Sequence, residues 1–488
     1  MSIGSRQEAS RSRRLLHRRR QRLTMALIGG LVGIEFLENG MFVFAAAPIL
    51  AAIHAAPQDF ALVQMAYALG NMLMVVLQQW MTRHAGYRRY LLLALLLFGL
   101  GDVGCALAGS LPALIVARML QGMGGGAFFL SMRVLIPVLF SVGMRPLVAR
   151  AFMVAVFAAG AIAPALAANL VHAAGWPWVF WIQIPAVLLL AAGVQRRLPR
   201  QLGKSLEQVR WSIAPVLLFL LAASLVQWSL AEADYRLLRH PDQLALAVLA
   251  GITLLALFGV HQWRHDEPLL HLRDLVHPGY LAGLGLCALY YFIVNFSNYL
   301  FPQFAGQGLR LPVLTTGWLN SFSGAVTLGA VLLYLRYSAR VANKRAMMMA
   351  GCLRMAASAA WMARLPVDAS LATLLVPLPV RGLFGVLMVL PVASLTWKAL
   401  GDTHFAKGYQ AKNVMRQMMI SLASAVAAVS LQSARIAEFG TLARDLEGAG
   451  GAAIEAQAAF LAGQRMYLWI CGVSVLAAVI VAVQKKLR

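Results

Sequence analysis

Long apolar runs separated by short polar or basic segments dominate the chain. A membrane-spanning helix needs about 20 predominantly apolar residues, because it rises 1.5 Å per residue through a hydrocarbon layer about 30 Å thick. Strands of a membrane β-barrel would instead alternate apolar and polar positions over about ten residues, which these runs do not do. The pattern predicts fourteen helices, at residues 24–53, 59–82, 88–109, 111–139, 146–171, 176–194, 211–230, 243–262, 279–304, 311–337, 345–364, 370–397, 408–433 and 464–484.

Composition supports a membrane protein rather than a soluble one. Of the 488 residues, 60% are hydrophobic and 12% are charged, and the mean hydropathy is +0.72. A soluble domain has roughly half apolar and a quarter charged residues. The run from Met25 to Ile53 is also much longer than the core of a signal peptide, so we expect it to remain as the first helix. The predicted fold class is an all-α, polytopic membrane protein.

The net charge of +24 becomes informative once its location is considered. With a cytoplasmic N-terminus, the cytoplasmic segments hold 30 Lys or Arg residues, the outer segments hold 7, and five arginines fall within spans. This bias follows the positive-inside rule and predicts that both termini are cytoplasmic in a multi-pass inner (cytoplasmic) membrane protein. We expect the basic segments to contact anionic membrane lipids. No nucleic-acid-binding pattern accompanies them, so nucleic acid is not an expected partner.

A short sequence motif that occurs twice indicates an internal repeat. Arg83 to Arg88 and Arg340 to Arg345 both read R-x-A-x-x-R, and each joins the second and third helices of a set of six. Transporters are often built from such repeats, with the substrate site between them near the membrane midplane. The predicted organisation is therefore 6+2+6: a basic cytoplasmic N-terminal segment at 1–23, a six-helix bundle at 24–194, an inserted helix pair with flanking loops at 195–278 and a second six-helix bundle at 279–488.

Ionisable residues inside the predicted spans are the main functional candidates, because charge in hydrocarbon is costly and commonly marks a pathway or relay. Glu35 and Glu38 are three residues apart and so share one helix face. Residue counting places Arg118 and Asp102 each about 10 Å from the outer loop, and Glu38 about a dozen Å deeper. Arg118 could therefore pair with either Glu38 or Asp102. These four residues are the candidate proton-coupling group, with a purely structural ion pair as the alternative.

Helix 279–304 carries a polar face. Tyr291, Asn295 and Asn298 share it at helical spacing, which predicts either a cavity lining or hydrogen bonds between helices. Arg133 is a further cation within a span. The excess of arginines over acids within the spans leaves aromatic or amphiphilic acids as plausible substrates, while capping of backbone carbonyls is the alternative role for these arginines.

Several stretches carry motifs that resemble a known family. Residues 118–124 read R-M-L-Q-G-M-G, residues 160–164 read G-A-I-A-P, and residues 175–180 read G-W-P-W-V-F. Glu267–Leu270, Arg381–Gly382 and Arg416–Gln417 add shorter matches. Together they resemble the major facilitator superfamily, specifically its fourteen-span drug:proton antiporter branch. The chain departs from the family where Thr82 precedes Arg83 and where alanines follow Pro164, so the gating ion pair of that loop is in doubt.

The resemblance implies a secondary transporter, specifically a proton-coupled antiporter for multidrug efflux, working by alternating access on small hydrophobic or amphiphilic compounds. It assigns Arg118 to proton coupling. Motif residues implied in the conformational change are Gln121, Gly122, Gly160, Pro164, Arg83 and Arg88. A periplasmic adaptor and an outer-membrane channel would be additional partners if the protein works in a tripartite pump.

Other functions remain open from the sequence. An uptake carrier or uniporter for an organic acid would share this architecture, and a non-transporting sensor is a further alternative. A membrane-embedded enzyme would need a polar cluster at a membrane face, for which only the loop around His265 and Asp266 offers residues. We expect a solvated loop there rather than a metal site. No G-x-x-x-x-G-K-[ST] sequence occurs, so ATP is not the expected energy source, and we expect no enzyme activity and no cofactor.

Overall fold

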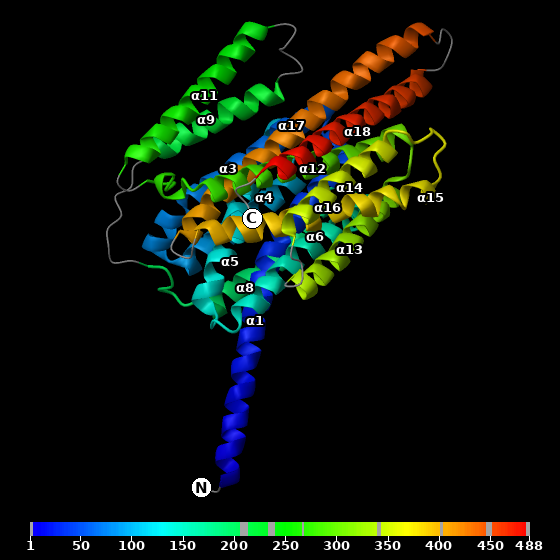
Figure 1. The fold of residues 1–488 in the computed structure, drawn as a ribbon. Coiled ribbons are helices and arrows are strands. Elements are labelled where there is room, and N and C mark those ends of the chain that lie inside the picture. Colours follow the sequence, from blue (N-terminus) through cyan, green and yellow to red (C-terminus); the bar gives the residue numbers. More distant parts are fainter. Residues whose placement is uncertain are drawn as a thin grey trace.

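The protein is a bundle of long helices, seen in a computed structural model that describes residues 3–204, 213–232, 240–265, 268–338, 343–400, 404–445 and 451–484. Within these ranges every regular element is helical, and the N-terminal part of α1 projects from the bundle (Figure 1). The prediction of an all-α polytopic fold is confirmed. Arg340, Asp266 and Glu267, on which parts of the sequence analysis rest, lie outside the described residues.

The N-terminal half begins with a long helix, and a short helix follows it after a single residue. Its elements are α1 (Ile3–Phe44), α2 (Ala46–Ala52), η1 (Pro57–Asp59), α3 (Phe60–Ala85), α4 (Tyr87–Ala106), α5 (Leu111–Leu139), α6 (Arg145–Ala174), α7 (Trp178–Trp181) and α8 (Gln183–Arg197). The hairpin that follows is α9 (Ile213–Ala231) and α11 (Pro241–Arg264).

The C-terminal half repeats this plan with two unusually long final helices. Its elements are η2 (Arg273–Leu275), α12 (Pro278–Gln303), η3 (Phe304–Gly308), α13 (Val313–Tyr337), α14 (Lys344–Met362), α15 (Leu371–Leu374), α16 (Pro377–Leu400), α17 (Phe405–Asp445) and α18 (Gly451–Val483). α17 and α18 run on well beyond the predicted ends at 433 and 464, so most of the predicted outer loop is helical.

Three predicted spans are interrupted rather than continuous. The span 370–397 divides into α15 and α16, and prolines explain the other two breaks. A helical proline clashes with the carbonyl group four residues earlier. Pro48 stands four residues after Phe44, where α1 ends, and Pro185 stands four residues after Trp181, where α7 ends. The prediction of one helix over 24–53 and one over 176–194 was wrong in this detail.

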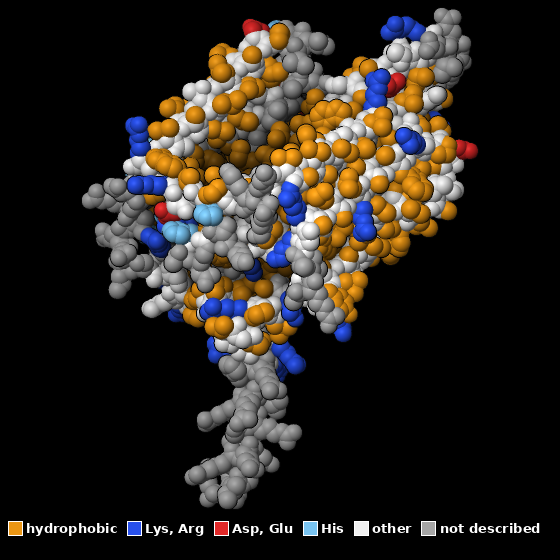
Figure 2. Space-filling view, viewed as in Figure 1, with side chains coloured by type: hydrophobic (Ala, Val, Ile, Leu, Met, Phe, Trp, Pro, Cys, Tyr) orange, Lys and Arg blue, Asp and Glu red, His pale blue; other side chains and the backbone are white. Residues whose placement is uncertain are grey.

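Twelve of the described helical segments are long and apolar enough to cross a membrane. The other two predicted spans, 211–230 and 345–364, do not meet this criterion of length and hydropathy. The apolar part of α9 covers only Ala214–Ser229, and α14 is a 19-residue helix that carries Lys344, Arg345 and Arg354. Hydrophobic side chains cover much of the visible face (Figure 2). A multi-pass membrane protein is confirmed, whereas the count of fourteen spans stays a prediction.

The two halves meet through two matching helix pairs. α3 packs on α17, and α6 packs on α13. Counted within each half, both pairs join a second helix to a fifth helix, which is the arrangement expected from two related six-helix units. The hairpin of α9 and α11 lies to one side of the bundle (Figure 1), and its helix α9 packs against α3 and α17. The chain thus places one interface on each side of a central space.

The α6–α13 crossing is close because small residues face each other there. A Cβ atom on Gly317 would lie 2.3 Å from Cβ of Ala168, and one on Gly324 would lie 2.5 Å from Cα of Ala161. Ser321 on α13 also accepts a 2.8 Å hydrogen bond from the backbone N–H of Ala165 on α6. Small residues at such positions allow helix backbones to approach within a membrane.

Candidate functional site

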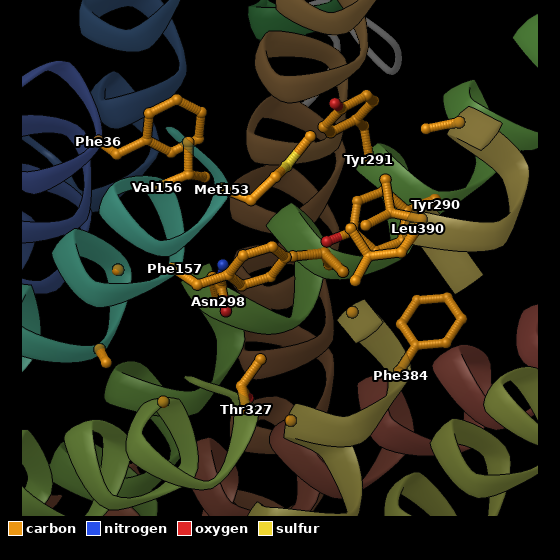
Figure 3. A pocket seen from close by; sticks show the side chains of 18 of the residues that line it. Phe36, Met153, Val156, Phe157, Tyr290, Tyr291, Asn298, Thr327, Phe384 and Leu390 are labelled. Carbon is orange, nitrogen blue, oxygen red and sulfur yellow. The ribbon is translucent and has the colours of Figure 1, made fainter. Parts of the chain in front are cut away.

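A central cavity of about 750 Å³ lies between the two halves. Its walls come from α1, α5, α6, α12, α13, α14, α16 and α17. Met153 and Phe157 of α6, and Tyr290 and Asn298 of α12, point into the same space (Figure 3). This volume is within the range of small-molecule sites, roughly 300–1,000 Å³, so the cavity can accommodate a drug-sized compound.

The cavity reaches the helix ends on the side of the N-terminus. Arg150, near the start of α6, Ser338, just after α13, and Lys344, the first residue of α14, belong to its lining. Helices alternate in direction along the chain, so these three residues lie at the same side of the bundle as the N-terminal segment. The cavity is therefore accessible from that side.

Aromatic residues close the opposite end. Phe60, the first residue of α3, stacks on Phe42 of α1 with ring centroids 5.7 Å apart. It also stacks on Tyr299 of α12 with centroids 4.8 Å apart. All three side chains are buried. Because Tyr299 belongs to the other half, this stack holds the two halves together at the closed end.

An ion pair crosses between the halves at the cavity wall. Arg416 of α17 donates through Nη2 to Oε1 of Glu35 on α1 at 2.7 Å, and both side chains are almost completely buried. Arg416 also donates through Nε to Asn413 at 2.8 Å. The guanidinium lies 4.6 Å from the ring centroid of Phe129. Glu35 therefore faces the cavity and contacts the opposite half at once.

A second buried pair lies within the N-terminal half. Arg118 of α5 donates to Glu38 of α1 and to the side-chain oxygen of Gln121, whose amide nitrogen donates in turn to Asp102 of α4. Arg118 is completely buried and lies against the ring of Phe42, 3.8 Å from its centroid. The sequence left Glu38 and Asp102 as alternative partners. The structure pairs Arg118 with Glu38 and links Asp102 through Gln121.

Residue counting overestimated the depth difference between Glu38 and Arg118. The count assumed that the first helix and the α4–α5 hairpin end at the same level on the outer side. The direct contact between Arg118 and Glu38 shows that they do not. Glu38 lies only six residues before the end of α1 at Phe44, because Pro48 ends that helix early.

Glycines let α5 bring Arg118 and Gln121 to this position. A Cβ atom on Gly122 would lie 2.1 Å from the carbonyl oxygen of Tyr67, and one on Gly126 would lie 2.3 Å from that of Asn71. Both carbonyl groups belong to α3. The sequence predicted a conformational role for Gly122, and the structure gives it a close helix crossing that a larger side chain would prevent.

The predicted substrate residues lie in the cavity wall. Tyr291, Asn295 and Asn298 of α12 and Arg133 of α5 all belong to the lining. Asn295 donates a 2.7 Å hydrogen bond to the backbone oxygen of Tyr291, while Asn298 is exposed to the cavity (Figure 3). Helical spacing alone therefore identified a face that the structure directs towards this space.

The other motif residues divide between cavity and loop. Gly160 and Pro164 line the cavity on α6, and the carbonyl oxygen of Pro164 lies 2.8 Å from where a Cβ atom on Gly317 would be. Arg83 and Arg88 lie instead at the α3–α4 connection, away from the cavity. Arg88 donates to Gln195 at 3.2 Å, which ties α4 to the end of α8.

Two further cations in the wall were not among the predicted functional residues: Lys412, which is buried, and Arg381, which is half-buried and entered only as part of a family motif. Lys412 of α17 is 6% exposed and donates to the hydroxyl group of Tyr291 at 2.9 Å. Arg381 of α16 donates to the backbone oxygen of Ser297 at 3.3 Å and to Asn320. Lys412 could have been recognised as a lysine inside the apolar run 408–433. Because it follows closely after a basic loop, it was counted with the loop rather than as a buried cation.

The chain resembles known transporters in sequence and in fold. A family model described as Major Facilitator Superfamily matches residues 28–428. The "Putative multidrug resistance protein MdtD" of Salmonella paratyphi B is 28% identical over 235 residues, which are 47% of this chain and 48% of that protein. The same-named protein of Salmonella typhi is 27% identical over the same length. The match thus spans about half the length of these curated relatives.

Solved structures share the fold at low sequence identity. A POT family peptide transporter described as auto-inhibited has a TM-score of 0.63 at 14% identity, covering 94% of this chain and 96% of that one. A bacterial homologue of the human lysosomal transporter Spinster, inward-facing and unoccupied, has a TM-score of 0.63 at 12% identity, covering 95% and 96%. These findings confirm the predicted transporter class in place of an enzyme. The chain belongs to the major facilitator superfamily.

Proposed function

We propose that this protein exports small hydrophobic or amphiphilic compounds across the cytoplasmic membrane by alternating access, driven by protons. The observation that carries the proposal is a largely aromatic and apolar cavity of about 750 Å³ whose wall contains the buried Glu35–Arg416 pair. An ionisable group inside a membrane protein commonly belongs to a substrate pathway or a proton relay. The name of the MdtD relatives agrees with drug export.

Proton coupling is assigned to two linked groups of residues. Glu38 would exchange a proton next to Arg118, with Gln121 and Asp102 extending the polar chain. Glu35 would exchange a proton next to Arg416, at a contact between the halves. Protonation of either carboxylate would remove the charge that holds its arginine. A proton can thereby shift the balance between two conformations, provided that it binds them with different affinities.

Substrate contacts are assigned to the walls of α5 and α12. Tyr291, Asn295 and Asn298 would supply hydrogen bonds, and Arg133 would supply a positive charge. Aromatic and aliphatic side chains around them would hold the apolar part of a substrate. Pro164 at the α6–α13 crossing, Gly160 one turn before it on α6, and Gly122 at the α3–α5 crossing would be positions at which the helices move relative to one another.

The proposed orientation places the N-terminal segment and the C-terminus in the cytoplasm. The bias of 30 basic residues to 7 supports it, and the cavity would then face the cytoplasm. Bundles at 24–194 and 279–488, separated by the inserted region 195–278, agree with the α3–α17 and α6–α13 packing. The predicted periplasmic adaptor and outer-membrane channel remain to be tested by co-purification from cells.

Dye export tests the proposed function. Wild-type protein in everted vesicles should move an amphiphilic dye when a proton gradient is imposed, and a protonophore should abolish the movement. Glu38→Gln and Glu35→Gln should each reduce proton-driven export at least about tenfold. Asp242→Asn is the matched control, because Asp242 is an exposed acid at the start of α11. Export that persists in Glu38→Gln would show that the coupling assignment is wrong, and flux insensitive to the protonophore would indicate a uniporter.

A further inference from the structure

The charges around the cavity are strongly unbalanced. Among the residues that the structure describes, its lining contains six basic side chains and one acidic side chain, Glu35; the basic residues are Arg133, Arg150, Lys344, Arg381, Lys412 and Arg416. Glu35 is already paired with Arg416 at 2.7 Å. Arginine stays protonated in proteins. The remaining cations therefore create a positive potential in the space where a substrate would sit.

Lys412 has only neutral partners among the described residues. Its Nζ donates to the hydroxyl group of Tyr291 and lies 5.3 Å from the ring centroid of Phe129 and 5.2 Å from that of Tyr409. Rings stabilise a cation through their π-faces, but none of these groups supplies a negative charge. A buried cation without a counter-charge is unfavourable, so this position is suited to receive an anion.

Arg133 approaches the same aromatic wall. Its Cζ lies 5.9 Å from the centroid of Tyr409 and 5.4 Å from that of Phe405. Phe405 and Tyr409 stack with centroids 5.6 Å apart. The buried Nε of Arg133 has no hydrogen-bond partner within the described part of the chain. Lys412 and Arg133 thus both lie close to the ring of Tyr409, and neither forms an ion pair with an acidic residue in the described part of the chain.

A flat apolar body can lie close to these two cations. Phe129 stacks on Tyr409 with centroids 5.7 Å apart, so the wall of α5 and α17 is aromatic between Lys412 and Arg416. Met153, Val156 and Phe157 of α6 point into the same cavity (Figure 3). A ligand that combines an aromatic ring with a negatively charged group would use both features.

We propose that the wall formed by Phe129, Arg133, Tyr409 and Lys412 binds the negatively charged group of aromatic organic acids, which makes organic anions the preferred substrate class. This inference rests on the proposed function, since it specifies what the exporter carries. Lys412 and Arg133 bind the anionic group, and the adjacent rings bind the aromatic body. Neutral amphiphiles bind more weakly, and cationic ones are disfavoured by the excess of positive charge.

Three probes with the same ring and different charges test the proposal. Calorimetry on the purified full-length protein in detergent would compare 2-naphthoate, neutral 2-naphthylmethanol and cationic 2-naphthylmethylammonium. We expect 2-naphthoate to bind at least tenfold more tightly than the ammonium compound. Lys412→Gln should weaken 2-naphthoate binding at least tenfold, and Lys412→Arg should largely preserve it. Lys407→Gln is the matched control, because Lys407 lies on the same helix and pairs with Asp274 outside the cavity.

Binding of the neutral alcohol establishes whether Lys412→Gln keeps its fold. If that variant does not fold, the charge preference of the wild-type protein and the response of Arg133→Gln decide the question. Equal or tighter binding of the ammonium compound, no binding of 2-naphthoate, or unchanged 2-naphthoate affinity in both variants would overturn the proposal.

Transport in proteoliposomes separates this proposal from the proposed function. Selective binding of 2-naphthoate without proton-driven flux would leave the anion site standing and disprove proton-coupled export. Proton-driven flux of a cationic dye, without affinity for 2-naphthoate, would leave the exporter standing and disprove the anion site.

Discussion

Glu35 and Arg416 join the first helix of one half of the transporter to the fifth helix of the other. The two residues are 381 positions apart in the sequence, and the oxygen and nitrogen atoms of the pair are 2.7 Å apart. Both side chains are buried, and both line the central cavity. A movement that separates α1 from α17 at this level has to break this contact, which lies in the wall of the proposed substrate cavity.

Removing one partner of this pair should be far more damaging than removing an exposed pair. Glu35→Gln or Arg416→Gln leaves the other charge buried without compensation, so each should lower the free energy of unfolding by about 3–5 kcal/mol. The double variant should lose less than the two single losses added together, because no charge is then left alone. Unfolding by denaturing detergent, followed by circular dichroism, measures these differences.

The pair formed by Glu438 and Arg465 provides the control. Its atoms are 3.0 Å apart; Glu438 is 14% exposed, but Arg465 is 61% exposed. Glu438→Gln should change the free energy of unfolding by no more than about 1 kcal/mol, because the arginine left without its partner is in contact with solvent. Additive losses in the Glu35–Arg416 cycle would mean that the two side chains do not stabilise each other.

Close packing at Gly122 should make even one added methyl group disruptive. Gly122→Ala would place Cβ 2.1 Å from the backbone oxygen of Tyr67, so α3 and α5 would have to separate and Arg118 would shift from Glu38. We expect a marked loss of folded protein by fluorescence-detected size-exclusion chromatography. Gly329→Ala, in a helix position with no atom within 4 Å of the added Cβ, should fold normally, since alanine is a better helix former than glycine. Normal yield of Gly122→Ala would disprove the tight crossing.

The helical architecture could be predicted from the sequence because each span is a local feature. A run of about twenty apolar residues can be recognised without reference to any other part of the chain. In the same way, Tyr291, Asn295 and Asn298 share a face because of local helical spacing. The breaks after Phe44 and Trp181 were also readable from Pro48 and Pro185, but length alone dominated the prediction.

The pairing of buried charges could not be predicted in the same way. Glu38 and Arg118 appeared to differ in depth, because residue counting cannot show where neighbouring helices end relative to one another. Glu35 and Arg416 lie in different halves, and one sequence holds no signal that joins them. Lys412 was missed for a local reason, its closeness to a basic loop, although its burial distinguishes it clearly in the structure.

Labelling of an introduced cysteine should reveal which side the cavity faces. Thr327→Cys, in a background with Cys471→Ser, would place a thiol in the lining on α13. A membrane-impermeant maleimide should label it in everted vesicles, where the cytoplasmic side is accessible, at least about fivefold faster than in intact cells. Val63→Cys is the buried comparison at the closed end and should react slowly in both. Faster labelling of Thr327→Cys in intact cells would contradict the proposed orientation of the cavity.

The aromatic stack at the closed end should control access from the opposite side. Tyr299→Ala removes the ring that α12 places 4.8 Å from Phe60, and an aromatic pair contributes about 0.5–1.5 kcal/mol beyond the area that it buries. That loss favours opening of this end, so labelling of Thr327→Cys in intact cells should rise roughly three- to tenfold. Phe292→Ala is the matched control, since Phe292 contacts Phe296 on the same helix and takes no part in the stack. If Tyr299→Ala and Phe292→Ala gave equal labelling rates, the stack could not be what holds the two halves together at this end.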